Sequence, residues 1–444
     1  MKQDFLDYIR DEFDFSDSEI SDFEGSLNTP LKKSIRVNTN KISVVDFKKL
    51  AKKNTWTLTE TSLGNNIFYI DRPDTSIPLG HTPEHISGLF YVQELAASSS
   101  PFYMSEDKID ITPYLILDMS ASPGGKTTQL TEYYPNSLIV ANELDKTRLK
   151  GLFSNLDRMS SLNTVVSNYD GRFFKQVPEI FDKVLLDAPC SGEGTGYKTD
   201  DALKYWNIKN IKRIAKLQFG LLEAAIKATK PGGEIVYSTC TLNTIENEQI
   251  VAKIIKKYDE YIEVDKNYIR AWPHINKTGG FFVAKIKKIK SMKIEKESKL
   301  VNQNIGKISN KETRIIQEFF MSNFDYDISD KYLYRYHSDI MLCSQNIDNT
   351  WDILFFYKIG VNIGDFKDGV FYPNFFGGSI ESFKKGTIAL CEKDLDIVLK
   401  GYEIESKNTD GYYQIMSPNN LPLGLAKLQN NSLKSLLPTN MMRK

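Results

Sequence analysis

The chain has 444 residues, of which 41% are hydrophobic and 26% are charged, and its 57 lysines and arginines are balanced by 57 aspartates and glutamates. This length allows about two to four domains, and the composition is that of an ordinary soluble globular protein. No apolar run approaches the ~20 residues that cross a bilayer, and the acidic start excludes an export signal, so we expect a cytoplasmic protein with no membrane partner.

The four cysteines are too few for a disulfide scaffold, and none forms a CxxC pair. With only four histidines, ligands for a structural zinc site are scarce, so we expect no metal. A free cysteine is most often a small buried apolar residue, and we predict that role for Cys343 and Cys391. Cys190 and Cys240 need a different explanation.

The charges are unevenly distributed along the chain. Residues 1–24 are strongly acidic, whereas 283–299, "VAKIKKIKSMKIEKESK", is rich in lysine. A neutral chain is by itself a poor nucleic-acid binder, because binding to phosphates needs clustered cations. Charged runs are usually solvated faces or linkers, so the lysine-rich run adds only secondary support for a nucleic-acid contact.

The first hundred residues are predicted to form a small α/β module. Residues 34–53, "SIRVNTNKISVVDFKKLAKK", have the pattern of a short strand followed by an amphipathic helix. Two further strands are expected at 55–60 and 66–70.

From residue 101 to about 290, apolar runs alternate with helical stretches, as in a parallel sheet built from βαβ units. The expected strands are 114–120, 137–143, 162–170, 181–189 and 232–240, and the expected helices are 126–134, 146–159, 207–229 and 244–257. Residues 281–289, "FFVAKIKKI", predict one more strand, at an edge because alternate residues are lysines. These elements predict an α/β fold with a doubly wound, mostly parallel sheet of six or seven strands.

Each of the five central strands finishes on a polar residue. Any one of these residues alone would be a cap or turn former, but the carboxyl ends of neighbouring parallel strands form one rim, where ligands bind. We therefore expect all five to line one crevice: Asp118, Glu143, Asp170, Asp187 and Cys240.

The stretch "LDMSASPGGKTTQL" predicts a ligand-binding turn between a strand and a helix. Gly124 and Gly125 allow the backbone to approach a ligand, and the following helix offers N–H donors to an anionic group. The stretch is neither a P-loop nor GxGxxG. Glu143 is placed to accept hydrogen bonds from ribose hydroxyls, and Asp170 from an adenine amine. Ribose, adenine and an amino-acid carboxylate together describe S-adenosyl-L-methionine.

The two remaining cysteines end similar runs, "FDKVLLDAPCSGEGT" and "GGEIVYSTCT". A thiolate that adds to C6 of cytosine makes C5 nucleophilic, and loss of the C5 proton later expels the sulfur. A cysteine in a polar crevice can have the lowered pKa that such an attack needs. Cys190 and Cys240 thus fit methylation at C5 of cytosine.

These stretches resemble, in order and spacing, the motifs of the RNA cytosine-5 methyltransferases of the Sun/nucleolar-protein family. The likeness extends to "VANELDKTR" and "YDGRFF", and to "SIRVNTNK" and "GHTPEHISGLFYVQELAASSS" of that family's N-terminal RNA-side module. The tail "LPLGLAKLQNNSLKSLLP" resembles the end of the PUA-like domain in the RsmF branch, which acts on 16S ribosomal RNA near the decoding site. The resemblance covers most of the chain and thins after residue 300.

This resemblance implies a Rossmann-like methyltransferase fold that binds S-adenosyl-L-methionine, and a role for each matching residue. Glu143 would hold the ribose, Asp170 the adenine end, and Asp187 would lie between cofactor and target base. Cys240 would be the nucleophile, and Cys190 would assist product release. The cofactor loop would comprise Ala121, Ser122, Pro123, Gly124, Gly125, Lys126 and Thr127, with Lys126 also contacting the flipped base.

Four domains are expected: an N-terminal RNA-side module (1–100), the catalytic domain (101–290), a linker with an intermediate domain (291–365) and a PUA-like RNA-binding domain (366–444). Most of the aromatic residues after 330 are expected in the core.

The predicted function is methylation of C5 of cytosine in the decoding region of 16S rRNA. We expect the protein to act as a monomer, with naked RNA or the small ribosomal subunit as its partner and without an obligate protein partner. The same chemistry on tRNA, DNA or other RNA, and a non-catalytic ribosome-assembly factor with this fold, are the alternatives.

Overall fold

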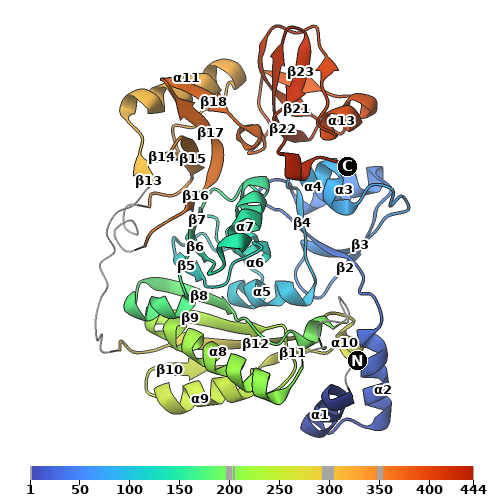
Figure 1. Cartoon of the computed structure of the whole chain (residues 1–444), viewed down its shortest axis with the longest axis vertical. Coiled ribbons are helices and arrows are strands. Elements are labelled where there is room, and N and C mark those ends of the chain that lie inside the picture. Colours follow the sequence, from blue (N-terminus) through green and yellow to red (C-terminus); the bar gives the residue numbers. More distant parts are fainter. Residues whose placement is uncertain (1–2, 197–202, 204–205, 293–304, 348–353, 444) are drawn as a thin grey trace.

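The computed structural model describes residues 3–196, 203, 206–292, 305–347 and 354–443. The N-terminal helices and the C-terminal sheets lie at opposite ends of its longest axis, with the central sheet between them (Figure 1). Among the described residues, no helix is both long enough and apolar enough to cross a membrane.

The acidic N-terminus forms two helices, α1 (Gln3–Phe13) and α2 (Asp17–Leu27). Ser16 begins α2 with a capping box, because its hydroxyl accepts from the Glu19 N–H while the Glu19 carboxylate accepts from the Ser16 N–H. Phe5 and Phe23 are fully buried against a cluster that includes Trp206 of the catalytic region. The charged run is therefore the outer side of two amphipathic helices.

The N-terminal module contains an antiparallel four-stranded sheet in the order β2-β3-β1-β4. The strand and helix expected within 34–53 are confirmed. The elements of the module are β1 (Ser34–Val37), α3 (Val44–Lys53), β2 (Thr57–Glu60), β3 (Ile67–Asp71), η1 (Leu79–His81), α4 (Pro83–Ile86) and β4 (Phe90–Val92).

The central sheet has nine strands, in the order β10-β12-β9-β8-β5-β6-β7-β16, with β11 also paired to β12. The five predicted central strands are confirmed and run parallel to one another: β5 (Leu115–Asp118), β6 (Leu138–Asn142), β7 (Thr164–Ser167), β8 (Phe181–Asp187) and β9 (Thr229–Thr239). The other four pair antiparallel: β10 (Ile262–Val264), β11 (Ile269–Ala271), β12 (Phe281–Lys288) and β16 (Lys358–Ile359).

Helices cover both faces of this sheet, as a doubly wound fold requires (Figure 1). Along β5, Leu117 faces α8 and α9, whereas its neighbour Ile116 faces α5 and α6. The elements beside the sheet are η2 (Ala96–Ser98), α5 (Ser99–Ser105), α6 (Gly125–Tyr133), α7 (Lys146–Arg158), η3 (Gly171–Gln176), η4 (Glu193–Thr195), α8 (Ile208–Ala228), α9 (Glu248–Tyr258) and α10 (Pro273–Asn276).

The edge position predicted for 281–289 is wrong. β12 pairs with β9 on one side and with β10 and β11 on the other, so it is an interior strand. Of the alternate lysines, Lys285 pairs with the exposed Glu106 and Lys287 is itself exposed, whereas the fully buried Lys288 pairs with Glu179. The alternate lysines therefore marked the more exposed side of an interior strand rather than an edge of the sheet.

Two five-stranded sheets form the C-terminal part, of which the first is antiparallel and the second is mixed. The first, in the order β13-β14-β15-β17-β18, carries α11 (Asn310–Phe324) and consists of β13 (Ile305–Lys307), β14 (Tyr332–Tyr336), β15 (Asp339–Cys343), β17 (Val361–Lys367) and β18 (Val370–Pro373). The second, in the order β19-β21-β22-β23-β20, carries α13 (Glu392–Leu399), and η6 (Phe375–Gly378) and η7 (Thr439–Met441) flank it. Its strands are β19 (Thr387–Ala389), β20 (Ile404–Glu405), β21 (Gly411–Met416), β22 (Pro422–Gln429) and β23 (Ser432–Ser435).

The two C-terminal sheets pack around one hydrophobic cluster that includes Phe320, Phe366 and Leu425. The boundary placed at 365/366 falls inside β17, so a division after β18 agrees better with the strand pairing. The four domain ranges otherwise stay predictions, as does the PUA-like character of the last sheet. Part of the lysine-rich run, residues 293–299, lies outside the described residues.

The core role predicted for two cysteines is confirmed for one of them. Cys343 is fully buried, whereas Cys391 is exposed, and the prediction for Cys391 is wrong. Cys391 is the N-cap of α13, where its sulfur accepts from the Asp394 N–H at 3.4 Å. A helix start needs such an acceptor at the surface. Of the 15 described phenylalanines and tyrosines after residue 330, seven are buried and five are partly buried, whereas Tyr332, Tyr372 and Tyr402 are exposed.

Candidate active site

The loop after β5 leads directly into α6, and Asp118 anchors the junction. The Asp118 side chain is fully buried and accepts a 2.7 Å hydrogen bond from the Thr127 hydroxyl in the first turn of the helix. Burial raises the pKa of Asp118 to about 6, although Thr127 and the charge of Lys126 partly oppose this rise.

The predicted cofactor loop is held in place by contacts with β6 and α7. The Ala121 N–H donates to the Asn142 carbonyl at 2.9 Å, and Arg148 donates to the Ser122 carbonyl at 2.6 Å. Asn155 donates to the Pro123 carbonyl at 2.9 Å. Gly124 has φ +105, and an added Cβ would lie 3.1 Å from Leu152, so this turn requires glycine.

Glu143 lies just past β6 and faces this loop. It is 4% exposed, and its carboxylate accepts from the N–H groups of Ser122 at 3.3 Å and Asp145 at 2.9 Å. Arg148 lies 3.5 Å from the same carboxylate. These contacts fix the carboxylate at the rim of the sheet, and lone pairs remain for further donors.

Asp170 follows β7 and caps η3. Its carboxylate accepts from the Arg172 N–H at 2.9 Å, and both of its oxygens are bonded by the Arg172 guanidinium. Asn142 and Asn168 connect the ends of β6 and β7, so Asp170 lies on the same rim as Glu143. A ligand amine at Asp170 would share the carboxylate with Arg172.

The two thiols meet at the ends of β8 and β9. The sulfur atoms of Cys190 and Cys240 are 3.1 Å apart, and both residues are partly exposed. Beside them, Lys126 donates to the Asp187 carboxylate at 2.8 Å, and the Ser238 hydroxyl donates to the other oxygen of Asp187 at 2.9 Å. The structure thus brings together, at one rim, residues that are 114 positions apart in the chain.

The charges of this cluster influence one another. Burial alone would lower the pKa of Lys126, but the negative charges of Asp187 and Cys240 outweigh it and raise that pKa. The hydrogen bond to Cys240, followed by burial, raises the pKa of Cys190 well above its usual value. Of the two thiols, Cys190 is therefore the one whose protonated form is favoured.

Comparisons with known proteins agree with this arrangement. Residues 110–287 match the model of the 16S rRNA methyltransferase RsmB/F family, and residues 1–95 match that of the N-terminal domain of 16S rRNA methyltransferase RsmF. Ribosomal RNA small subunit methyltransferase F of Vibrio campbellii is 33% identical over 453 residues, covering 96% of this chain and 94% of that protein. The protein of the same name from Shewanella loihica is 34% identical and covers 93% and 90%.

The chain belongs to the RsmB/F family of 16S rRNA methyltransferases. Among solved structures, a methyltransferase homolog from Pyrococcus horikoshii is 29% identical, with a TM-score of 0.56 over 65% of this chain and 100% of that one. NSun6 from Pyrococcus horikoshii, solved with SFG, has the same fold at 23% identity, a TM-score of 0.57, and coverage of 65% and 99%.

RsmB/F proteins take the methyl group from S-adenosyl-L-methionine, and the residues at this rim fit that cofactor. The first-turn N–H groups of α6 can bind its carboxylate, and the glycine turn lets the ligand approach the backbone. The Glu143 carboxylate suits the ribose hydroxyls, and Asp170 suits the adenine amine.

Two buried glutamates of this RsmB/F protein were missed in the sequence, although Glu193 lies in the stretch quoted around Cys190 and Glu246 in the helix expected over 244–257. Glu193, in the turn after Cys190, accepts from Trp206 Nε1 at 2.7 Å and from the Thr241 hydroxyl and the Asn243 N–H at 2.8 and 3.0 Å. Glu246 accepts from the Ser191 N–H at 3.0 Å and from Gln218 and Asn243 at 2.8 Å each. These carboxylates join the two thiol-bearing turns.

The backbone of the Cys190 turn is equally constrained. The Gly194 N–H donates to the Cys240 carbonyl at 3.0 Å, and Gly280 donates to the Gly194 carbonyl at 2.9 Å. A Cβ on Gly194 would lie 2.1 Å from the Gly280 carbonyl oxygen, so no other residue fits at position 194 without backbone movement. Close packing of these turns fixes the distance between the sulfurs.

Glu193→Ala is expected to lower both stability and activity. The substitution leaves several buried donors without an acceptor, so the free energy of unfolding should fall by about 3 kcal/mol. Methyl transfer should fall at least tenfold, because the turns that carry Cys190 and Cys240 lose their shared partner. Denaturant unfolding and single-turnover kinetics measure both effects. The exposed Glu263→Ala is the control, and an equal loss in that variant would contradict the interpretation.

Asp118→Asn is expected to change the pH dependence of stability. Because the folded pKa of Asp118, about 6, is raised above the ordinary 3.8, ionisation costs stability as pH rises through this window. Wild type should therefore lose about 2 kcal/mol relative to the variant between pH 3.8 and 6.5. Denaturant titrations at several pH values, with exposed Asp11→Asn as control, measure this difference. A constant difference across that range would contradict it.

Proposed function

We propose that this protein transfers a methyl group from S-adenosyl-L-methionine to C5 of a cytosine in 16S rRNA, through a covalent bond between Cys240 and C6. The observation that carries the proposal is the 3.1 Å contact of the two thiols beside Lys126 and Asp187, at the rim that also holds Glu143. When bound there, S-adenosyl-L-methionine supplies an electrophilic methyl group.

The first step is attack by the Cys240 thiolate on C6 of the cytosine. Lys126 favours the thiolate by its positive charge, and Cys190 donates a hydrogen bond to it. The new C–S bond uses a thiolate electron pair, and the electrons of the C5–C6 double bond make C5 nucleophilic.

Asp187 is the group that positions the base. Lys126 and Ser238 fix its carboxylate, and 27% of its side chain is accessible, so it faces the crevice with a defined orientation. A carboxylate in that place can accept a hydrogen bond from the exocyclic amine of cytosine.

Release requires removal of the C5 proton and expulsion of the Cys240 sulfur. Once the adduct has formed, the Cys240 sulfur is bonded to C6, so the hydrogen bond and the charge by which it raises the pKa of Cys190 are lost. Cys190 then ionises more readily and can take the C5 proton, while the C6–S bond breaks and the Cys240 thiolate returns. The same contact thus keeps Cys190 protonated before attack and allows it to act as a base afterwards.

The RNA must present an unpaired cytosine, because C5 of a stacked base is inaccessible. We assign RNA contacts to the N-terminal module and to a PUA-like last sheet. We also propose that the protein acts as a cytoplasmic monomer without an obligate protein partner.

Methyl transfer from tritiated cofactor, measured in parallel with deproteinised 16S RNA, intact 30S particles and tRNA, tests the proposed function. Incorporation into either substrate at cytosine C5 is expected. Labelling of tRNA alone would establish the first alternative, and no labelling of any RNA by wild type would favour a non-catalytic assembly factor.

A further inference from the structure

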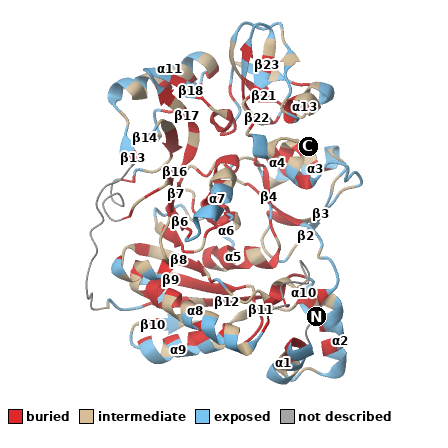
Figure 2. Ribbon diagram, viewed as in Figure 1, coloured by how far each residue is buried: buried red, intermediate tan, exposed pale blue. Residues whose placement is uncertain are grey.

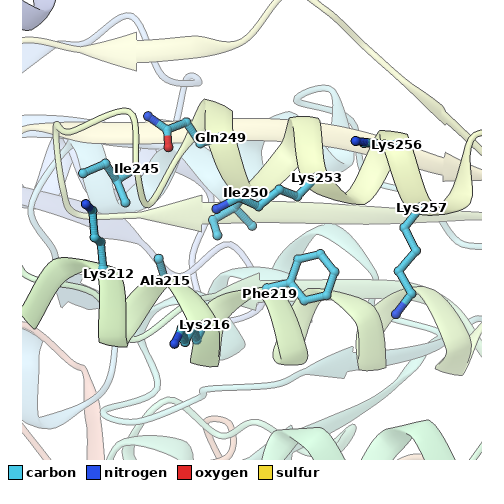
Figure 3. A pocket seen from close by; sticks show the side chains of 10 residues that line it. All are labelled: Lys212, Ala215, Lys216, Phe219, Ile245, Gln249, Ile250, Lys253, Lys256 and Lys257. Atoms are coloured by element: carbon cyan, nitrogen blue, oxygen red, sulfur yellow. The ribbon is translucent and has the colours of Figure 1, made fainter. Parts of the chain in front are cut away.

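A groove of about 850 Å³ lies between α8 and α9, on the face of the catalytic sheet away from α6 (Figure 3). The two helices meet beside the thiol-bearing turns, because Gln218 of α8 donates to the Pro189 carbonyl next to Cys190 and to Glu246, which lies just before α9. Ile245, five residues after Cys240, lines the groove. The groove therefore starts beside the candidate active site and runs away from it.

The rims of this groove are strongly basic in a chain whose net charge is zero. The two helices together carry eight lysines or arginines and only two glutamates. Both glutamates are already engaged, Glu223 with Lys175 and Lys257, and Glu248 with Arg270. Within the part of the chain that the structure describes, four exposed groove lysines have no carboxylate partner: Lys212, Lys216, Lys253 and Lys256.

The floor of the groove is apolar. Ala215 and Ile250 are buried there, and the ring of Phe219 is partly exposed between the helices (Figure 3). The Lys257 ammonium lies 5.5 Å from the centre of this ring. Figure 2 shows both buried and exposed positions along α8 and α9, as expected for amphipathic helices that cover a sheet. An aromatic ring between rows of cations is the combination that binds single-stranded nucleic acid, in which bases stack and phosphates are neutralised.

We propose that the groove between α8 and α9 binds a single-stranded segment of the substrate RNA next to the target cytosine. This inference rests on the proposed function, because it supplies a second contact for the same RNA. The groove lysines bind phosphates, and Phe219 stacks on a base. Since the groove opens at the thiol-bearing rim, an RNA strand lying in it would help to hold the flipped cytosine near Cys240.

The test is a variant in which the four unpaired lysines are replaced by glutamine: Lys212→Gln, Lys216→Gln, Lys253→Gln and Lys256→Gln. Lys257 is retained because it pairs with Glu223. The KM for deproteinised 16S RNA is expected to rise about tenfold, while kcat falls less than twofold. The slope of a plot of log RNA affinity against log salt concentration should become shallower by about 3, because each of the four lost phosphate contacts contributes ~0.7 to this slope.

A matched control removes four exposed lysines that lie outside the groove and outside the regions assigned to RNA contacts: Lys108, Lys150, Lys266 and Lys311. It changes the net charge equally but should leave the KM within twofold of wild type. Equal weakening by both variants would overturn the proposal, because it would show a general charge effect. An unchanged KM and salt slope in the groove variant would also overturn it.

Phe219→Leu tests the stacking contact separately, since leucine fills the floor without a π-face. A rise in KM of at least about fivefold is expected, with an unchanged salt slope.

Direct filter binding of 16S RNA separates this inference from the proposed function. If wild type binds RNA through the groove but transfers no methyl group, only the proposed function fails. A defect seen with 30S particles but not with naked RNA would mean that the groove binds a ribosomal protein, and would overturn the proposal.

Discussion

Cys240→Ala is expected to abolish methyl transfer to 16S rRNA, by at least about 10⁴-fold, and to prevent any covalent protein–RNA adduct. Without this sulfur, nothing adds to C6, so C5 never becomes nucleophilic. Cys190 cannot replace it, because the ends of β8 and β9 hold the two thiols in different positions beside Asp187. Tritium transfer and denaturing gel electrophoresis of protein–RNA mixtures measure the two losses.

Cys391→Ser is the control for the loss of a thiol at a distant site. Serine keeps the N-cap of α13, so this variant should retain wild-type activity. Adduct formation by Cys240→Ala would contradict the role assigned to Cys240.

Cys190→Ala is expected to have the opposite effect on the adduct. Attack by Cys240 and methylation of C5 proceed, but the C5 proton is removed slowly, so a stable protein–RNA adduct accumulates. Turnover should fall by about 10² to 10⁴, the range for loss of a general base. The trapped RNA should carry tritium from the labelled cofactor, which shows that the block follows methyl transfer.

The reverse pattern would exchange the two roles. If Cys190→Ala formed no adduct while Cys240→Ala trapped RNA, Cys190 would be the nucleophile. The raised pKa of Cys190 and the positive charge of Lys126 beside Cys240 argue for the order given above.

Much of the catalytic sheet is readable from the sequence, because its five parallel strands are continuous apolar runs separated by amphipathic helices. The observed β8 (Phe181–Asp187) and α8 (Ile208–Ala228) lie within two residues of the predicted ranges. The antiparallel strands β10, β11 and β16 were missed, since each has only two or three residues and depends on tertiary pairing. The interior position of β12 was missed for the same reason, because the strands that cover it, β10 and β11, are the short ones.

The rim residues were located by a simple rule, namely that parallel strands end at one edge. The sequence could not show that the Cys190 and Cys240 sulfurs touch, or that Lys126 lies against Asp187. The roles of Glu193 and Glu246 were also hidden, because a glutamate in a turn is usually solvated. What could have indicated these roles is that both glutamates lie close in sequence to Cys190 or Cys240, two residues that the proposed chemistry requires to be adjacent. The N-terminal helices left a clearer sign, the Ser16 to Glu19 capping box.

Bisulfite sequencing of 16S rRNA from a strain that lacks the gene, and from the same strain complemented with wild type or with Cys240→Ala, tests the proposed reaction most directly. We expect at least one cytosine to lose its C5 methyl mark in the deletion strain. Wild type should restore that mark and Cys240→Ala should not. An unchanged methylation pattern in the deletion strain, or full restoration by Cys240→Ala, would contradict methylation of 16S rRNA through a Cys240 adduct.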